Sequence, residues 1–519
     1  MFHPRRTLRA LLLPLAAGLA LAALPAGTAH AASTLTNAGF ESDGTGAAVP
    51  AGWSESGSTG ASYVEAGGHG GSYRLSHYSA SAYKVETYQT LTGLTNGSYK
   101  LAAWVRSGGG QNSAYLALKN CGGTAQRTDL PVSTSGWIHL VVPVSVTGSQ
   151  CTISVYSDAN AGNWINVDDL TFTSGTTGLS VKGSDISSLA KSEAYGGVYK
   201  TGSGTTGDAL AILKSSGMNY ARLKVWVNPA DGYNNKARVL AMAKRIKAQG
   251  MKLLVDFHYS DTWADPGKQT KPAAWSGHSY SQLKTDVYNH TYDVLNALKA
   301  QGTTADMVQI GNEINGGMLW SEGSTDNFAQ LAGLLNSGYD AAKAVSSATV
   351  VALHLAQGGD LTGTRWWFDT ALANGVKFDA IGLSYYGYWH GSLYDFQTTL
   401  DDAAARYGKP VFVAETAYPF RLDSDDALVN QIDTTGELVS GYVATTTGQS
   451  NWLRDVMSIV EAVPNGRGLG VFYWEATWTA VTGNGWDPAD PSSGNGWENQ
   501  ALFGFDDKAL PAMSLFGHR

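Results

Sequence analysis

Two glutamates, Glu313 and Glu415, each end a short apolar run, in MVQIGNE and in VFVAETA. Hydrolysis of a glycosidic bond needs a pair of carboxyl groups. One protonates the leaving oxygen, and the other attacks the anomeric carbon or activates water. Asn312 directly precedes Glu313 and carries an amide that could bind a sugar hydroxyl. Either glutamate alone could equally be a salt-bridge partner, so the hypothesis requires a fold that brings the two together.

Both glutamates lie in a region where short apolar runs alternate with helical segments such as RVLAMAKRIKAQG. The runs are VKGSDI, YARLKVW, KLLVDFH, DMVQIGNE, VVALHLA, DAIGLSYY, VFVAETA and LGVFYWE. This alternation predicts parallel strands joined by crossover helices. Because there are eight such units, we expect residues 180–519 to form an α/β fold, a (β/α)8 TIM barrel with long loops.

Active sites of such barrels lie at the C-terminal ends of the strands. Polar and aromatic residues at those ends are candidate substrate-binding residues. They are Arg222, Asp256, His258, Asp261, Trp263, Asp265, Asn312, His354, Tyr386, Trp389, His390, Trp474 and Trp478. We expect the charge of Arg222 to keep Glu415 ionised and Tyr386 to donate a hydrogen bond to Glu415. Trp263, Trp389 and Trp478, in the loops, would be flat apolar platforms for sugars.

Other residues near the strand ends are ambiguous. Glu475 follows the eighth run and could bind substrate or make a structural bond. Trp366 and Trp367 stand on a helical segment, so we interpret both as core residues.

Residues 32–173 follow a different pattern, with short alternating runs such as YKVETYQTLTGL and CTISVYSD separated by Gly, Asn and Ser. Such spacing predicts an all-β sandwich. The segments NAGFE and WINVDDLTF resemble the first and last strands of jelly-roll carbohydrate-binding modules, which often hold a structural calcium. Glu41 and Asp168 would then be the matching ligands, although simple surface acids explain them equally well.

The sandwich region also contains both cysteines of the chain, Cys121 and Cys151, which we expect to pair in an oxidising compartment. Its ligand cannot be read from the sequence. Candidate platforms are Tyr73, Tyr78, Tyr83, Trp104 and Tyr115, several of which will be core residues instead, and Trp53 is interpreted as core.

The first residues combine Arg5, Arg6 and Arg9 with an apolar stretch and the small-residue site Ala29-His30-Ala31. This pattern predicts a signal peptide over residues 1–31 and therefore a secreted, extracellular protein; an uncleaved anchor is the alternative.

No second apolar run is long enough to span a bilayer, so no membrane partner is expected after cleavage. The net charge of −8 argues against a nucleic-acid partner. A polar linker is expected over 174–179, and we expect a monomer.

The barrel region resembles glycoside hydrolase family 53, the arabinogalactan endo-β-1,4-galactanases. The resemblance is carried by GSDISSL, RLKVWVNP, GMKLLVDFHYSDTWADPGKQTKPAAW, MVQIGNEINGGMLW, IGLSYYGYWHG, VAETAYPF, VFYWEATW and NGWENQALFGF. It implies that Glu313 is the acid/base, that Glu415 is the nucleophile, and that the enzyme cuts pectic β-1,4-galactan internally with retention. The two carboxyl groups should then lie roughly 5–5.5 Å apart.

The resemblance also implies that catalysis needs no cofactor, while bacterial members can carry calcium near the loops after strands seven and eight. In this chain RLDSDDA and WDPAD fall in those loops. Asp423, Asp425, Asp487 and Asp490 could supply oxygen ligands to a structural ion. Solvated loop acids are the equal alternative.

Three competing functions remain open from the sequence. A mannanase, xylanase or endoglucanase would share the two glutamates but not the HYSDTWADPGKQ block. A non-catalytic carbohydrate-binding protein would not need Glu313 and Glu415. A metal-dependent barrel hydrolase would be expected to carry a clustered set such as His-x-His on a strand, which the sequence lacks.

Overall fold

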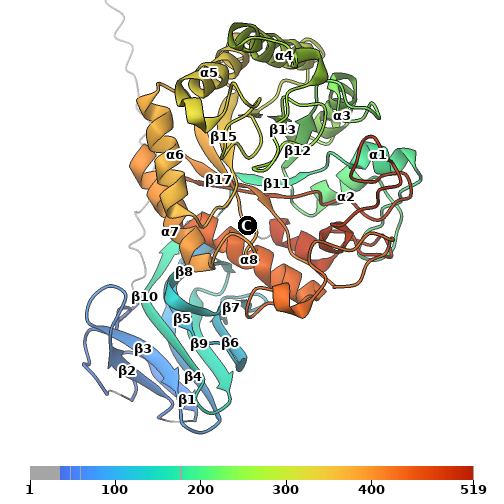
Figure 1. Cartoon of the computed structure of the whole chain (residues 1–519). Helices are drawn as coiled ribbons and strands as arrows, with labels where there is room; N and C mark the ends of the chain where they lie inside the picture. Colours follow the sequence, from blue (N-terminus) through green and yellow to red (C-terminus); the bar gives the residue numbers. More distant parts are fainter. Residues whose placement is uncertain (1–34, 47, 59, 176–177, 518–519) are drawn as a thin grey trace, which may run out of the picture. The chain divides into compact units, whose positions relative to one another are not determined.

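The computed structural model describes residues 35–46, 48–58, 60–175 and 178–517. The predicted signal peptide lies outside these residues. An all-β region comes first, and a closed barrel with helices follows (Figure 1). The first region ends with strand β10 (Trp164–Ser174), and the barrel begins with strand β11 (Val181–Asp185). The two strands flank the predicted linker, whose first residue, Ser174, belongs to β10.

The all-β region consists of two five-stranded antiparallel sheets, which confirms the predicted sandwich. The first sheet has the order β1 (Ser54–Gly57), β4 (Tyr83–Thr92), β9 (Gln150–Ala159), β6 (Gln111–Lys119) and β7 (Gln126–Asp129). The second has the order β2 (Ser62–Ala66), β3 (Tyr73–Tyr78), β10, β5 (Gly97–Ser107) and β8 (Ser133–Val146). In strands such as β4, alternate side chains enter the core, because successive residues of a strand point to opposite faces.

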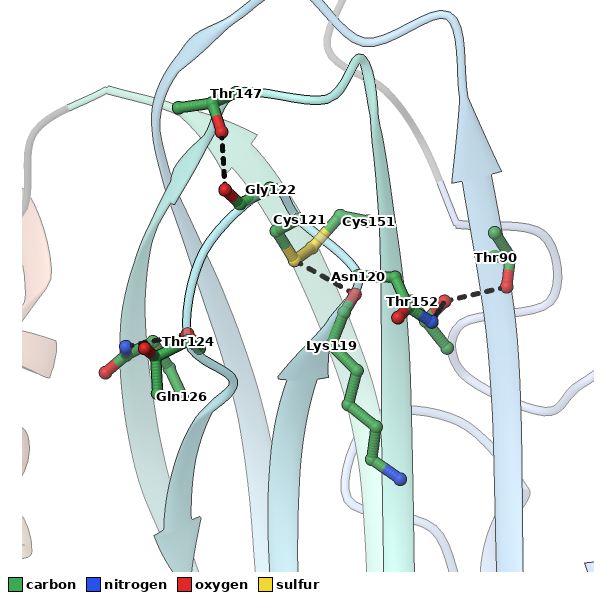
Figure 2. The surroundings of a disulfide bond; sticks show 10 residues. All are labelled: Thr90, Lys119, Asn120, Cys121, Gly122, Thr124, Gln126, Thr147, Cys151 and Thr152. Atoms are coloured by element: carbon green, nitrogen blue, oxygen red, sulfur yellow. Dashed lines mark hydrogen bonds between the residues drawn. A yellow bond between two sulfur atoms is a disulfide. The ribbon is translucent and has the colours of Figure 1, made fainter.

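The predicted disulfide is present and joins Cys121, just after β6, to Cys151 in β9 (Figure 2). These two strands are neighbours in the first sheet. Both cysteines are buried. The bond therefore links two adjacent strands at one end of the sandwich core.

The eight predicted runs form a closed parallel barrel, which confirms the predicted fold class. After β11 its strands are β12 (Tyr220–Val225), β13 (Lys252–Phe257), β14 (Met307–Ile310), β15 (Val350–Leu355), β16 (Ala380–Ser384), β17 (Val411–Thr416) and β18 (Gly468–Tyr473). Strand β11 pairs with both β12 and β18 and thereby closes the ring.

Helices follow most of the strands and surround the barrel (Figure 1). They are α1 (Leu189–Ala194), α2 (Ala209–Ser215), α3 (Lys236–Ala248), α4 (Tyr280–Ala300), α5 (Phe328–Val345), α6 (Leu361–Ala373), α7 (Leu393–Tyr407) and α8 (Thr446–Ala462). Local sequence sets their ends. Helix α7, for example, begins with a capping box of Ser392 and Asp395 and ends at Gly408 in the left-handed conformation. Among the residues described, no helix is both long and apolar enough to cross a membrane.

The inside of the barrel changes from apolar to charged along the strands. Near the N-terminal ends an apolar cluster includes Tyr220, Leu254 and Phe412. Residues two positions further on point to the same side of a strand. Two positions after Tyr220 the inward residue is Arg222, and two positions after Leu254 it is Asp256. The barrel interior is therefore apolar near the N-terminal ends of the strands. Directly below the C-terminal mouth it contains a buried layer of charged residues.

Candidate active site

Arg222 organises the charged layer beneath the mouth. Its side chain is only 2% exposed, yet it contacts three carboxylates at 2.8–2.9 Å, those of Asp185, Asp256 and Glu415. Its Nε donates to Gln309 at 2.8 Å. A buried guanidinium is costly unless its donors are paired, and these acceptors satisfy that requirement. Arg222 consequently has one orientation, with one donor directed at Glu415.

Glu415 is the penultimate residue of β17 and is held from two sides. Arg222 Nη2 lies 2.9 Å from Oε1, and the Tyr386 hydroxyl donates to Oε2 at 3.0 Å. Burial raises the pKa of Glu415 to about 8; the charge of Arg222 lowers it, and the neighbouring Glu313 raises it. Both expected partners of this carboxylate are therefore in contact with it.

Glu313 follows β14 through a tight turn. Gly311 has φ 86° and Glu313 has φ 47°, both in the left-handed region that non-glycine residues seldom adopt. Such strained backbone concentrates at functional sites. Burial raises the pKa of Glu313 to about 7; the hydrogen bond from Ser384 lowers it, the charge of Asp265 raises it and that of Arg222 lowers it.

The two glutamates differ in their partners. Glu415 contacts a cation, whereas the side chain of Glu313 contacts the neutral Ser384 hydroxyl at 2.6 Å. Interacting carboxyl groups titrate as a pair rather than independently. The raised pKa values belong to the pair, and when the pair holds one proton the contact with Arg222 favours the charge on Glu415 and leaves the proton on Glu313. That distribution is the one required of a nucleophile and an acid.

A chain of buried polar groups supports Glu313. Ser384 Oγ lies 2.8 Å from His354 Nε2, and His354 Nδ1 lies 2.9 Å from Asn312 Oδ1. Burial lowers the pKa of His354 well below its usual range, so the ring is neutral. Asn312 Oδ1 can only accept, so its 2.9 Å contact favours the ring proton on Nδ1 over the longer, 3.4 Å approach of the Glu313 backbone amide to the same nitrogen.

This arrangement lets Ser384 serve both protonation states of Glu313. The Ser384 hydroxyl donates to an ionised Glu313. When Glu313 is protonated, its own O–H can donate to Ser384, whose hydrogen then turns to His354 Nε2. A residue that acts first as an acid and then as a base needs a partner that accommodates both forms.

A cavity of about 690 Å³ opens above this layer. Most of the predicted substrate-binding residues line it. They are Arg222, His258, Trp263, Asp265, Asn312, Tyr386, Trp389, His390, Trp474 and Trp478, together with Glu313 and Glu415. The carboxyl groups and the candidate platforms thus share one space, of a size typical of small-ligand sites.

Three predicted residues do not line the cavity. Asp256 and His354 are fully buried. Asp261 accepts hydrogen bonds from the backbone amides of Asn228 and Ala273 and so connects two loops. Asn312 lines the cavity, but its Oδ1 accepts from Arg222 and its Nδ2 donates to the Ala264 carbonyl. Its amide orders the site, and the sugar contact expected of it stays a prediction.

Indole rings form the walls of the cavity. Trp263 stacks on Trp478 with ring centroids 5.9 Å apart, and Lys224 Nζ lies 3.9 Å from the centre of the Trp263 ring. Trp389 and Trp486 are 50% and 47% exposed, which is unusual for indoles in a folded protein. Apolar faces of this kind suit the C–H faces of sugar rings.

Sequence reasoning missed several residues of the site. Trp486 and Trp497 line the cavity, and both lie in loops, as the predicted platforms Trp263, Trp389 and Trp478 do. Asp185 and Ser384 stand at the ends of β11 and β16, so the strand-end rule would have found both. Lys224 also stands near a strand end and lines the cavity.

The structure decides the roles of Glu475 and of the two tryptophans of α6, which the sequence left ambiguous. Glu475 is buried, and it accepts from Lys224 at 2.8 Å and from the Ser188 hydroxyl at 2.7 Å, so its bonds are structural. Trp367 is buried, as is Trp53, which confirms both as core residues. The prediction for Trp366 is wrong, because its side chain is 52% exposed. Neighbouring helical residues point in different directions, and only one of the pair can face the barrel.

The calcium predictions find no support in the described part of the chain, where no three His, Cys, Asp or Glu side chains gather to hold a metal ion. Asp423 pairs with Arg421, and Asp490 accepts from Ser492. Glu41 and Asp168 both accept hydrogen bonds from backbone amides, of Ser72 and of His69. Asp425 and Asp487 belong to no such cluster either, and the two proposed sites stay predictions.

The barrel region of the chain is similar to known proteins. The family model "Glycosyl hydrolase family 53" matches residues 181–516. The chain is 36% identical over 374 residues to an endo-beta-1,4-galactanase of Bacillus subtilis (strain 168), covering 65% of this chain and 85% of the relative. It is 35% identical over 346 residues to an arabinogalactan endo-beta-1,4-galactanase of Thermothelomyces thermophilus, covering 65% and 99%.

Among solved structures, the Ignisphaera aggregans GH53 catalytic domain is 40% identical, with a TM-score of 0.63 over 65% of this chain and 95% of that one. The matched residues contain the barrel, the charged layer and both glutamates. From its barrel and from these matches, the chain belongs to glycosyl hydrolase family 53.

Proposed function

We propose that the protein is a secreted endo-β-1,4-galactanase that cleaves the galactan chains of type I arabinogalactan with retention of configuration. The observation that carries this proposal is the pairing of an acid and a nucleophile. Glu415 contacts Arg222, and Glu313, whose pKa burial raises to about 7, contacts a neutral hydroxyl. The family relatives named above supply the substrate class.

In the first step, Glu415 attacks the anomeric carbon while Glu313 gives its proton to the leaving glycosidic oxygen. The bond from the anomeric carbon to the leaving oxygen breaks, and an ester bond to Glu415 forms. Arg222 and Tyr386 hold the nucleophile in place without covering the space above it, because Glu415 still lines the cavity.

In the second step, the ionised Glu313 takes a proton from water, and the water oxygen attacks the same carbon. Glu415 leaves as a carboxylate, and its returning charge is stabilised by Arg222 at 2.9 Å. Ser384 donates to Glu313 in its ionised form and accepts from it once it is protonated again. Two inversions at one carbon give net retention.

The exposed indoles support endo action on a polymer. Trp389 and Trp486 extend the apolar surface of the cavity toward solvent, where they can hold sugar units beyond the one being cleaved. Secretion is proposed from the basic and apolar pattern of residues 1–31.

The test is product analysis with linear β-1,4-galactan beside mannan, xylan and carboxymethylcellulose. Short galacto-oligosaccharides from galactan alone, absent with Glu415→Gln, are the expected result. Proton NMR at early times should show the β anomer of the new reducing end first. Cleavage of another glycan but not of galactan would refute the substrate, and the α anomer first would refute retention. Binding without turnover of any glycan would favour a non-catalytic role.

A further inference from the structure

One residue of the HYSDTWADPGKQ block contacts the turn that carries Glu313. The block ends with Gln269, which lies in the loop after β13 and is only 2% exposed. Its Nε2 donates to the backbone carbonyl of Asn312 at 2.8 Å and approaches the backbone carbonyl of Glu313 at 3.5 Å. The side chain of Gln269 therefore restrains the backbone of the Asn-Glu pair.

The same amide group contacts the turn that carries Asp265. Gln269 Nε2 lies 3.1 Å from the Asp265 carbonyl oxygen. Asp265 and Lys268 form two backbone hydrogen bonds, of 2.9 and 3.0 Å, and the Gly267 amide donates to Asp265 Oδ1 at 2.8 Å. We call residues 265–268 the Asp265 turn. One buried amide thus connects the Asp265 turn to Glu313, whose pKa the charge of Asp265 raises.

The surroundings of Gln269 decide which way its carboxamide points. Its NH2 group has two hydrogens to share among three carbonyl oxygens, whereas an oxygen in the same place would face acceptors only. Gln269 Oε1 is buried and has no partner among the residues that the structure describes. An unpaired buried oxygen costs free energy. Such a cost is expected where a side chain serves the geometry of a site rather than the stability of the fold.

The turn between β14 and Glu313 requires restraint from its surroundings. Gly311 and Glu313 both have positive φ, and a glutamate keeps this conformation only where neighbouring contacts fix it. A second carboxamide works in the opposite direction, because Asn312 Nδ2 donates to the Ala264 carbonyl at 2.8 Å. The side chain of Gln269 thus bonds the backbone at Asn312, while the side chain of Asn312 bonds the backbone of the loop that holds Gln269.

The backbone of Gln269 is fixed independently of its side chain. Its carbonyl accepts a hydrogen bond from the Trp320 amide at 2.9 Å, and the next residue, Thr270, pairs with Trp320 in a β-bridge. Lys271 forms an ion pair with Glu322 at 2.7 Å. These contacts join the loops after β13 and β14 without the carboxamide. Removal of the carboxamide should therefore leave both loops in place and affect mainly the two turns that it contacts.

We propose that Gln269 is a positioning residue for the acid/base, and that it fixes Glu313 and the Asp265 turn in the arrangement that proton transfer to the leaving oxygen requires. The inference rests on the proposed function, in which Glu313 is the acid/base. Proton transfer needs a donor at hydrogen-bond distance and in the right direction, so a small displacement of the donor lowers the rate. The effect of Gln269 is confined to the steps in which Glu313 transfers a proton.

The test compares two substrates that differ in their need for an acid. The leaving oxygen of galactotetraose must be protonated, whereas the dinitrophenolate of dinitrophenyl β-galactobioside leaves without a proton. In the full chain, Gln269→Met keeps the length of the side chain and removes its donors. It should lower kcat/KM on galactotetraose by about tenfold or more, and change kcat/KM on the aryl substrate by less than about twofold. Gln269→Asn, which withdraws the amide by one methylene, should show the same selective loss and guards against a folding defect of the methionine variant.

Two reference variants separate the outcomes. Lys271→Met breaks the neighbouring ion pair between the same two loops and should leave both values of kcat/KM unchanged. Glu313→Gln should show the selective loss at its full size. A selective loss with Glu313→Gln, but equal losses on the two substrates or none with both Gln269 variants, would overturn the role of Gln269. Equal losses on the two substrates with Glu313→Gln would instead refute the acid/base role in the proposed function.

Discussion

A second cavity, which we call the Trp164 pocket, lies on the outer face of the second sheet of the sandwich and is lined by Arg74, Glu65, Asn166, Tyr78 and Trp164. The barrel mouth and this pocket both place an arginine, a carboxylate and an asparagine beneath aromatic rings, but they bury these groups to different depths. Side chains of Arg222 and Glu415 are 2% and 8% exposed, whereas those of Arg74 and Glu65 are 18% and 31% exposed. Electrostatic interactions strengthen as water is excluded. The mouth can therefore shift pKa values and stabilise reacting charge, whereas the pocket has the weaker electrostatics that suffice for binding.

The largest expected effect comes from the nucleophile. Glu415→Gln should lower kcat on soluble galacto-oligosaccharides by about 10⁴-fold or more, because loss of a covalent catalyst affects the whole reaction. Glu65→Gln in the pocket is the matched change and should leave that kcat unaltered. Reducing-end assays on both variants measure the difference. A comparable loss in the two would contradict the division of roles.

The buried arginine should differ from its exposed counterpart in stability as well. Arg222→Met leaves Asp185, Asp256 and Glu415 without their shared cation and should cost about 3–5 kcal/mol of unfolding free energy. Arg74→Met breaks a more exposed pair and should cost about 1 kcal/mol or less. Urea titration monitored by circular dichroism compares the two. Similar costs would mean that burial does not set the strength of these pairs.

The disulfide should matter to the sandwich and not to the barrel. Replacing both Cys121 and Cys151 by alanine should lower the stability of the sandwich by about 2–4 kcal/mol. The barrel should retain its kcat on galactotetraose, because neither cysteine lies in its cavity. Calorimetric unfolding with parallel activity measurements is the check. A fall in kcat at a temperature where the sandwich remains folded would show that the two regions are coupled.

The smallest effect concerns pH. Glu313 must be protonated to act as the acid and Glu415 must be ionised to attack, so kcat/KM should follow a bell-shaped pH profile whose basic limb falls as the pH rises through about 7. The charge of Asp265 raises the pKa of Glu313, so Asp265→Asn should move the basic limb to lower pH by a fraction of a unit. A pH profile on galactotetraose tests this. A limb that stays in place, or moves upward, would show that Asp265 does not act on Glu313 through its charge.

The sequence alone was sufficient for much of the catalytic region. Eight apolar runs separated by helical segments predicted the barrel, and the strand-end rule placed Glu313, Glu415 and most of the cavity residues at one mouth. These inferences succeed because a parallel barrel brings all eight C-terminal strand ends together, whatever their separation in the chain. Short alternating runs separated by turn residues predicted the sandwich. The two cysteines of that region predicted its disulfide.

Only the tertiary structure decided how each polar group is used. Asn312 bonds to Arg222 and His354, and Glu475 bonds to Lys224, because strands distant in the chain bring these partners within 3 Å. The Trp164 pocket depends on strand order, since Tyr63, Ser76, Asn166 and Arg106 meet only once β10 lies between β3 and β5. Periodicity tells which face of a strand a residue occupies, but it does not tell which strand will lie beside it. Local pattern therefore determined the architecture, while cross-strand register determined the partners and with them the chemistry.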